Sequence, residues 1–278
     1  MKPNSKRLHM FDIDGTLLTI DTKVWIIDKE EPHKPIIRID NFEVNKILTG
    51  IYMKDELKIQ YNGEVYYISN KLMNDINKKK RIPIERLGIS WIEFYSEDYI
   101  NNTKSTFLAK NIRHLRGRGE FISLISGRSN RSRHSDVLNS LRKNLKDLGI
   151  ELYKIYFLGD KFSYKHTDII SLNKTHILLE HLVGVKIEDG KFVSFRQDWF
   201  NDIYFYDDEK MNIDYANDIQ RIFDRVMKNT DNEVFKLIID RVKNNELKIT
   251  NNLVSNNEVN LFESNTIILK SPFKFPIN

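Results

Sequence analysis

Short runs of apolar residues, each ended by polar or turn residues, recur along the chain at 7–11, 121–125, 152–158 and 203–206. Runs of this length between turn residues are typical of buried strands. Between and after them, apolar residues recur at spacings of three and four, the period of an amphipathic helix. These helical segments follow residues that suit a helix N-terminus, namely Ser135 with Asp136, Thr175, and Asp214.

Strands that alternate with helices of this length predict an α/β fold, a doubly wound parallel sheet with helices on both faces. Ligands bind beyond the carboxyl ends of the strands in such a sheet. The residues that directly follow the apolar runs are therefore the candidates for chemistry: Asp12 and Asp14, then Ser126, Gly127 and Arg128, then Asp207 and Asp208.

The stretch between Asp14 and Ser126 is far longer than the roughly 30 residues of a βαβ unit, which predicts an inserted domain. Within it, 57–61 and 64–69 predict a hairpin across Asn62-Gly63, the strongest short turn signal. Helices are expected at 42–51 and 71–79.

We therefore predict a catalytic core at 1–23 and 103–228, an inserted α+β cap at 24–102 and a C-terminal extension at 229–278. A second hairpin is expected around Asp189-Gly190. The extension predicts a helix near 233–242 and strands near 247–250 and 266–269.

Composition narrows the possible chemistry. The chain has 278 residues, no cysteine and a formal net charge of +5. The absence of cysteine excludes disulfides, cysteine-ligated zinc, iron–sulfur clusters and thiol nucleophiles, so reactive groups must be oxygen or nitrogen. The small positive surplus permits an anionic partner without identifying one. No segment resembles a signal peptide or a membrane span, so a cytoplasmic protein without a membrane partner is expected.

The segment Phe11-Asp12-Ile13-Asp14-Gly15-Thr16-Leu17 places two carboxylates two positions apart, after a strand and before a glycine turn. Carboxylates held this close repel each other and favour a hard cation, for which Mg²⁺ is the first choice. One carboxylate can then attack a phosphorus atom while the other transfers the proton of the leaving group. The alternative interpretation is an exposed acidic turn.

This heptapeptide resembles the first motif, Asp-x-Asp-x-Thr, of the haloacid dehalogenase superfamily of phosphohydrolases. The resemblance implies a Rossmann-like core with an inserted cap, a nucleophilic Asp12, an acid and base at Asp14, and a phosphate-binding Thr16. The second family motif is a Ser or Thr that ends the next core strand, and Ser126 matches it. The following Gly127 and Arg128 resemble the variant found in polynucleotide 3′-phosphatases.

The third family motif is a Lys at the start of a helix, which neutralises charge that develops in the transition state. Lys174, which leads into the apolar positions of a predicted helix, matches this motif. Lys161 and Lys165 remain alternatives.

The fourth motif is a carboxylate pair after another strand, and Asp207-Asp208 matches it. Asp160 is a competing match, but it precedes every lysine candidate that leads a helix, so motif order favours Asp207-Asp208. By analogy, Asp208 holds the metal with Asp12 and the main-chain carbonyl of Asp14, while Asp207 lies beside them and orients Lys174. The division of roles between Asp207 and Asp208 stays open.

Basic residues after the second strand indicate the substrate. Arg128 and Arg131, with Arg133 and His134, are expected on the same rim as Asp12, where they could hold further phosphates or a nucleic-acid backbone. The alternative is a solvated loop. No Gly-x-x-x-x-Gly-Lys-Ser/Thr occurs, so no kinase activity is predicted.

Together these features predict a Mg²⁺-dependent phosphomonoesterase that forms an aspartyl-phosphate, with a nucleotide or a nucleic-acid 3′-phosphate end as its substrate. Two alternatives stay open: a small-metabolite phosphatase that acts on a sugar phosphate, and a binding or structural protein that keeps this scaffold without its chemistry. The oligomeric state is not indicated by the sequence.

Overall fold

The computed structural model describes residues 7–19, 22–40, 57–61, 64–68, 70–95, 104–112, 120–128, 135–147, 149–158, 170–196, 198–228, 233–244, 248–249, 253, 259–261 and 264–274. Internal contacts divide the chain into two compact units, one formed by Met1–Thr19 and Lys104–Asn278 and the other by Ile20–Thr103. The predicted cap at 24–102 lies within the second unit, and the predicted extension at 229–278 lies within the first.

The first unit is built on a six-stranded sheet, and all four predicted apolar runs are strands in it. The order in space is β10, β9, β1, β13, β16, β15. Their bounds are Leu152–Phe157 (β10), Glu120–Ser126 (β9), Arg7–Phe11 (β1), Asp202–Asp207 (β13), Ser264–Lys270 (β16) and Val259–Leu261 (β15). The first four strands are parallel, as predicted.

The sheet departs from the predicted all-parallel arrangement at one edge. Strand β16 pairs antiparallel with β13 over the whole length of β13, and β15 pairs antiparallel with β16. Both strands come from the predicted C-terminal extension, which therefore completes the core sheet. Ile267 and Leu269 of β16 are fully buried in the same core as the parallel strands. Their burial explains why β16 covers the edge of β13.

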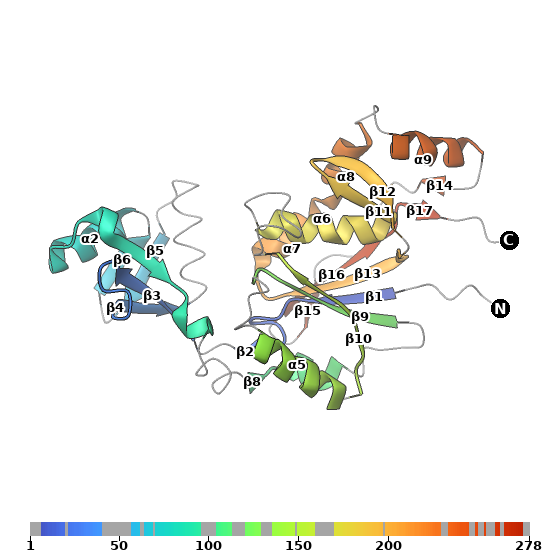
Figure 1. Ribbon diagram of the computed structural model, residues 1–278. Coiled ribbons are helices and arrows are strands. Elements are labelled where there is room, and N and C mark those ends of the chain that lie inside the picture. Colours follow the sequence, from blue (N-terminus) through green and yellow to red (C-terminus); the bar gives the residue numbers. More distant parts are fainter. Residues whose placement is uncertain are drawn as a thin grey trace. The chain divides into compact units, whose positions relative to one another are not determined.

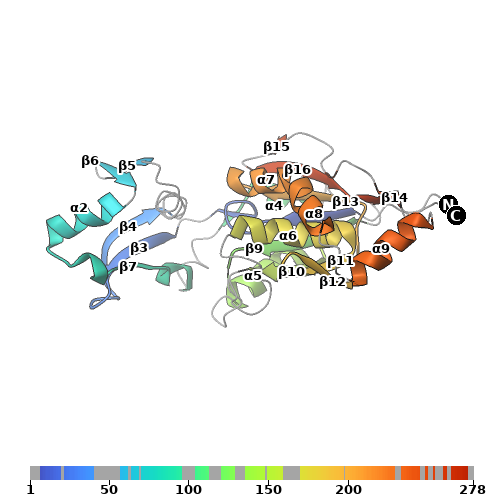
Figure 2. The same cartoon turned by 90° about the horizontal axis from the view of Figure 1, so that it is seen from above.

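Helices lie on both faces of the sheet (Figures 1 and 2). Helix α5 (Ser135–Asp147) lies on one face, and α6 (Ile170–Val183) and α7 (Lys210–Asn217) lie on the other. Leu8 and Met10 of β1 pack with Ile177 and Leu178 of α6 in one buried cluster. The unit is thus a mixed α/β domain with a mostly parallel central sheet.

Two predicted helix boundaries were wrong. The helix expected after Asp214 is two helices, because the chain leaves helical geometry at Asp218 (φ −82°, ψ 8°) between α7 and α8 (Ile219–Met227). Helix α6 begins at Ile170, so Lys174 lies in its second turn and not at its start. Buried residues continue back to Ser171, one turn earlier than the pattern after Thr175 indicated, and those of the added turn, Ser171, Asn173 and Lys174, are polar or charged.

Shorter elements complete the first unit. The predicted hairpin is formed by β11 (Val185–Glu188) and β12 (Lys191–Phe195), and both turn residues, Asp189 and Gly190, have the positive φ that a type I′ turn needs. The other elements are β2 (Leu18–Thr19) paired with β8 (Lys104–Ser105), α4 (Phe107–Asn111), α9 (Glu233–Lys243), and β14 (Lys248–Ile249) paired with β17 (Phe273–Lys274).

The second unit combines strands and a helix, the α+β composition predicted for the cap. Strands β4 (Pro35–Asp40), β3 (Lys23–Asp28) and β7 (Leu87–Ser90) form an antiparallel sheet. Strands β5 (Leu57–Tyr61) and β6 (Glu64–Ile68) form the predicted hairpin, followed by α2 (Asn70–Lys80). Two short 3₁₀ helices span Ile84–Arg86 and Ile92–Tyr95. The helix predicted at 42–51 lies outside the described residues.

Among the described helices, none combines the length and the apolar character that crossing a membrane would require.

Candidate active site

The carboxyl end of β1 turns sharply away from the sheet. The N–H of Asp12 still bonds the Tyr206 carbonyl of the neighbouring strand at 2.9 Å, and the chain then folds back so that the Leu17 N–H bonds the Ile13 carbonyl at 3.0 Å. Gly15 in this turn has φ +82°, and a Cβ there would lie 2.1 Å from the Asp208 Oδ2. Only glycine therefore allows this turn to lie against Asp208.

Three carboxylates meet at this point because β1 and β13 are adjacent parallel strands that end side by side. One oxygen from each of Asp12, Asp207 and Asp208 lies within 4.8 Å of the other two. Asp12 and Asp207 are buried, with 6% and 0% exposure, whereas Asp208 is exposed. The chain order along the sheet reverses at β1, so the cluster lies where α/β sheets bind ligands.

The Lys174 ammonium holds two of these carboxylates together. Its Nζ donates to Asp12 Oδ1 at 2.6 Å and to Asp207 Oδ2 at 2.7 Å, and the residue is only 3% exposed. Burial lowers the pKa of Lys174, but the charges of Asp12 and Asp207 raise it more, and the pKa lies above its ordinary value. The alternatives Lys161 and Lys165 lie outside the described residues.

The carboxylates themselves are short of positive charge. Burial raises the pKa of Asp12 well above its usual range, Lys174 opposes this rise, and the neighbouring aspartates add to it. Desolvation by the surrounding protein, followed by the charges of Asp207 and Glu209, raises the pKa of Asp208 to about 7. A cation among these oxygens would favour their ionised forms.

Asp208 and Asp207 are each oriented by neutral donors. The Thr16 hydroxyl, fully buried, donates to Asp208 Oδ1 at 3.2 Å and accepts the Asp208 N–H at 3.0 Å. Thr16 was predicted to bind phosphate, and the structure places its hydroxyl on Asp208. The Oδ1 of Asp207 accepts the Glu209 N–H at 3.0 Å and the Asn212 amide at 2.8 Å.

Asp14 is not one of the three clustered carboxylates, although its charge contributes to the raised pKa of Asp12. Both of its oxygens accept bonds from the Arg128 guanidinium: Nη2 donates to Oδ1 at 2.6 Å and Nε donates to Oδ2. The pair is largely buried, with side-chain exposures of 17% for Asp14 and 9% for Arg128. The sequence predicted Asp14 as a metal ligand through its main-chain carbonyl, and the bonds from Arg128 involve only its side chain, so this prediction stays open.

Ser126 ends β9, as predicted, and is 1% exposed. Its hydroxyl accepts the Arg128 N–H at 3.2 Å, which fixes the turn that carries the guanidinium. A Cβ on Gly127 would lie 3.2 Å from Ile170 at the start of α6, so the turn packs closely on that helix. Arg131, Arg133 and His134 lie outside the described residues, as does Asp160.

Three polar residues that support the site were missed from the sequence. Asn212 and Ser171 bond each other, and Thr106 donates to the Thr16 carbonyl at 2.8 Å. In a chain rich in Asn, Ser and Thr, none of these residues carries a local signal. Asn212 follows the Asp207-Asp208 pair closely on the next helix, which is the one feature that could have indicated it.

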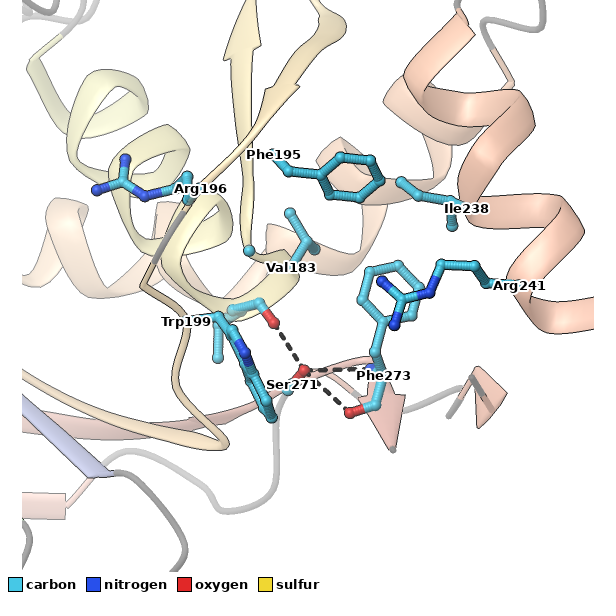
Figure 3. Close-up of a pocket in the computed structure, with 10 residues that line it drawn as sticks. Val183, Phe195, Arg196, Trp199, Ile238, Arg241, Ser271 and Phe273 are labelled. Atoms are coloured by element: carbon cyan, nitrogen blue, oxygen red, sulfur yellow. Dashed lines mark hydrogen bonds between the residues drawn. The ribbon is translucent and has the colours of Figure 1, made fainter. Parts of the chain in front are cut away.

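A pocket of about 290 Å³ lies at the other end of α6, away from Lys174 in the second turn. Figure 3 shows Ser271 among the residues that line it; the Ser271 hydroxyl donates to the Leu182 carbonyl at 2.6 Å. Apolar side chains dominate the lining, which includes Phe195, Trp199 and Ile238. No predicted site residue lines this pocket.

Comparisons of the chain with models of known protein families, with curated proteins and with solved structures found no match.

Proposed function

We propose that this protein is a Mg²⁺-dependent phosphomonoesterase of the haloacid dehalogenase type, with Asp12 as its nucleophile. One observation carries the proposal: Lys174 bridges Asp12 and Asp207 beside Asp208 at the carboxyl ends of adjacent parallel strands. Two buried aspartates on one buried lysine, with a third carboxylate beside them, leave an excess of negative charge that is unfavourable in a purely structural ion pair.

In the first step, an Asp12 carboxylate oxygen attacks the phosphorus of the monoester, and the bond from phosphorus to the ester oxygen breaks. Asp14 gives its proton to the departing oxygen. Lys174 stays on Asp12 and offsets charge on the phosphoryl group, while the Ser126 hydroxyl and the Arg128 guanidinium bind phosphoryl oxygens.

Arg128 occupies both Asp14 oxygens in the structure. Proton transfer needs one of these oxygens, so the bond from Arg128 to it must break when the substrate binds. The phosphate of the substrate is a suitable new acceptor for the guanidinium.

In the second step, water attacks the phosphorus of the aspartyl-phosphate and Asp14 takes its proton. Phosphate leaves and the Asp12 carboxylate is restored. The same residue thus acts as acid in the first step and as base in the second.

The donor set fits a magnesium ion, because the clustered side-chain groups are carboxylates, whose oxygens Mg²⁺ prefers. Asp12 and Asp208 would hold it, with the main-chain carbonyl of Asp14. When bound, the ion supplies positive charge that offsets the repulsion between the carboxylates and the phosphoryl group. Asp207 accepts three hydrogen bonds already, from Lys174, Asn212 and the Glu209 N–H, so we assign it the orientation of Lys174.

A nucleotide or a nucleic-acid 3′-phosphate end is the proposed substrate, on the resemblance of Ser126-Gly127-Arg128 to polynucleotide phosphatases. Initial rates on mononucleotides, sugar phosphates and 3′-phosphorylated oligonucleotides, measured side by side, separate this assignment from a sugar phosphatase. Thermal shifts with Mg²⁺ and a phosphate-mimicking fluoride complex separate both from a binding protein, which would not be stabilised.

Replacement of the nucleophile tests the reaction itself. Asp12→Asn should reduce Mg²⁺-dependent hydrolysis of p-nitrophenyl phosphate to the background rate, because the amide oxygen is a poor nucleophile. Asp147→Asn, at an exposed position on α5, is the matched control and should keep full activity. Undiminished turnover by Asp12→Asn would rule out the mechanism.

A further inference from the structure

Two buried polar side chains stand behind the candidate site, Ser171 on α6 and Asn212 on α7, each 2% exposed. The Ser171 hydroxyl donates to Asn212 Oδ1 at 2.6 Å, and the Asn212 amide donates to Asp207 Oδ1 at 2.8 Å. Buried polar groups need such partners. In this pair, Asn212 also bonds a residue of the site, Asp207, and Ser171 connects to it through Asn212.

The direction of these hydrogen bonds is determined by the groups involved. If the Asn212 amide were reversed, its carbonyl oxygen would face the Asp207 carboxylate, which accepts hydrogen bonds only. The amide nitrogen therefore faces Asp207, and its carbonyl accepts the proton of Ser171. One directed chain results, from Ser171 through Asn212 to Asp207.

Helix α6 carries both Ser171 and Lys174, the two residues that connect to Asp207 by different routes. Ser171 and Lys174 are three positions apart, so they lie on the same face of the helix. Ser171 reaches Asp207 through Asn212, and Lys174 reaches the same carboxylate directly at 2.7 Å. Asp207 is thus held on Oδ1 by Asn212 and the Glu209 N–H, and on Oδ2 by the ammonium.

We propose that Asn212, oriented by Ser171, is a positioning residue that holds the Asp207 carboxylate so that Lys174 is kept on Asp12. The kinetic consequence of this inference rests on the proposed phosphatase reaction, whereas the positioning of the ammonium does not. Asn212 touches neither the proposed nucleophile nor the proposed metal ligands through any described hydrogen bond.

Asn212→Leu removes the side-chain hydrogen bonds with Ser171 and Asp207, and a longer one to Glu209 at 3.5 Å, at similar side-chain volume. Because Lys174 acts on charge that develops in the transition state, we expect kcat to fall by about 10- to 100-fold, the range typical of residues that orient a catalytic group. The KM and the Mg²⁺ concentration for half-maximal rate should change by less than about twofold, since Asp12 and Asp208 are untouched. Asn217→Leu, at an exposed position of the same helix, is the control and should keep wild-type kinetics.

A second measurement follows the ammonium without any substrate. In ¹⁵N-labelled protein, a buried ammonium bonded to two carboxylates should give a slowly exchanging NMR signal, assigned by its loss in Lys174→Met. Asn212→Leu should shift or abolish this signal, and Asn217→Leu should leave it unchanged. If Asn212→Leu does not fold, Ser171→Ala, which only frees the amide, should shift the same signal and lower kcat by a smaller factor.

The outcomes separate the two proposals. An unchanged Lys174 signal together with an unchanged kcat in the variants would overturn the positioning role and leave the phosphatase reaction standing. Wild-type protein without turnover, but with a Lys174 signal that responds to Asn212→Leu, would overturn the proposed function and keep the positioning role. If the KM or the Mg²⁺ concentration for half-maximal rate changed in Asn212→Leu by as large a factor as kcat, the positioning role would be overturned, since Asn212 would then act in ground-state binding.

Discussion

Replacement of Lys174 by methionine tests whether the ammonium holds the acidic cluster together. Methionine has a similar length and no charge, so it preserves packing while it removes the bonds to Asp12 and Asp207. The variant leaves two buried carboxylates, at 6% and 0% exposure, without a counter-charge.

Breaking a buried ion pair by removal of one partner costs about 3–5 kcal/mol, because the remaining charge stays uncompensated. The cost at this site should lie in that range at pH 7.5, since three carboxylate oxygens lie within 4.8 Å of one another around the ammonium. For a unit of this size, each kcal/mol lowers the melting temperature by roughly 2–4 °C, so a decrease of roughly 6–20 °C is expected.

Urea unfolding in EDTA measures this change. It is followed by tryptophan fluorescence in a background where Trp25 and Trp91 of the second unit are replaced by Phe, so that only Trp199 in the first unit reports. Lys143→Met, at an exposed position on α5, is the control and should alter the free energy of unfolding by less than about 0.5 kcal/mol. Asp207→Asn in the Lys174→Met background removes one uncompensated charge, so the double variant should be more stable than the sum of the single changes predicts, by about 1 kcal/mol or more.

A destabilisation below about 1 kcal/mol, or strict additivity of the two changes, would refute this account. It would mean that the cluster already carries enough protons to be neutral without the ammonium. The two bonds from Lys174, to Asp12 and to Asp207, would then not be what holds the three carboxylates together.

Three further predictions concern the same cluster. Gly15→Ala should lower the proposed phosphatase activity at least about tenfold, because its Cβ displaces Asp208. Gly190 also has a positive φ, with nothing within 4 Å of an added Cβ, so Gly190→Ala should lose only about 1 kcal/mol of stability. Because the pKa of Asp208 is raised to about 7, the folded metal-free protein keeps a proton that the unfolded chain releases, so its stability should fall as pH rises from about 4 to about 7. In urea unfolding in EDTA, the free energy of unfolding should depend less on pH in Asp208→Asn than in the wild type. Equal slopes of this free energy against pH would contradict the prediction. Asp14→Asn should still release about one equivalent of p-nitrophenolate per protein, because this leaving group departs without a proton. The variant should then stall with phosphate on Asp12, detectable by mass spectrometry, because the base for the second step is missing; continued turnover would exclude that role.

The parallel strands and the hairpin turn were predictable because the sequence patterns that indicate them involve only neighbouring residues. Each apolar run at 7–11, 121–125, 152–158 and 203–206 is ended by turn residues, and the Asp189-Gly190 turn needs only its own two residues. The antiparallel strand β16 was placed less well, because an apolar run at 266–269 does not indicate which edge it joins or in which direction. Which edge β16 joins, and in which direction, depends on the free edge of β13 and on the apolar core beside it, which only the folded chain brings together.

The same difference between local patterns and distant contacts applies to the residues of the candidate site. By itself, the sequence determined which residues stand at strand ends, and hence that Asp12, Ser126 and Asp207 would meet at one edge of a sheet. Only the tertiary structure decided that Lys174 reaches Asp12 across 162 positions, that Arg128 takes Asp14 across 114, and that Asn212 supports Asp207. Local patterns report backbone conformation, whereas the partner of a charged side chain depends on which residues the folded chain brings within hydrogen-bond distance, where burial makes an unpaired charge too costly to leave.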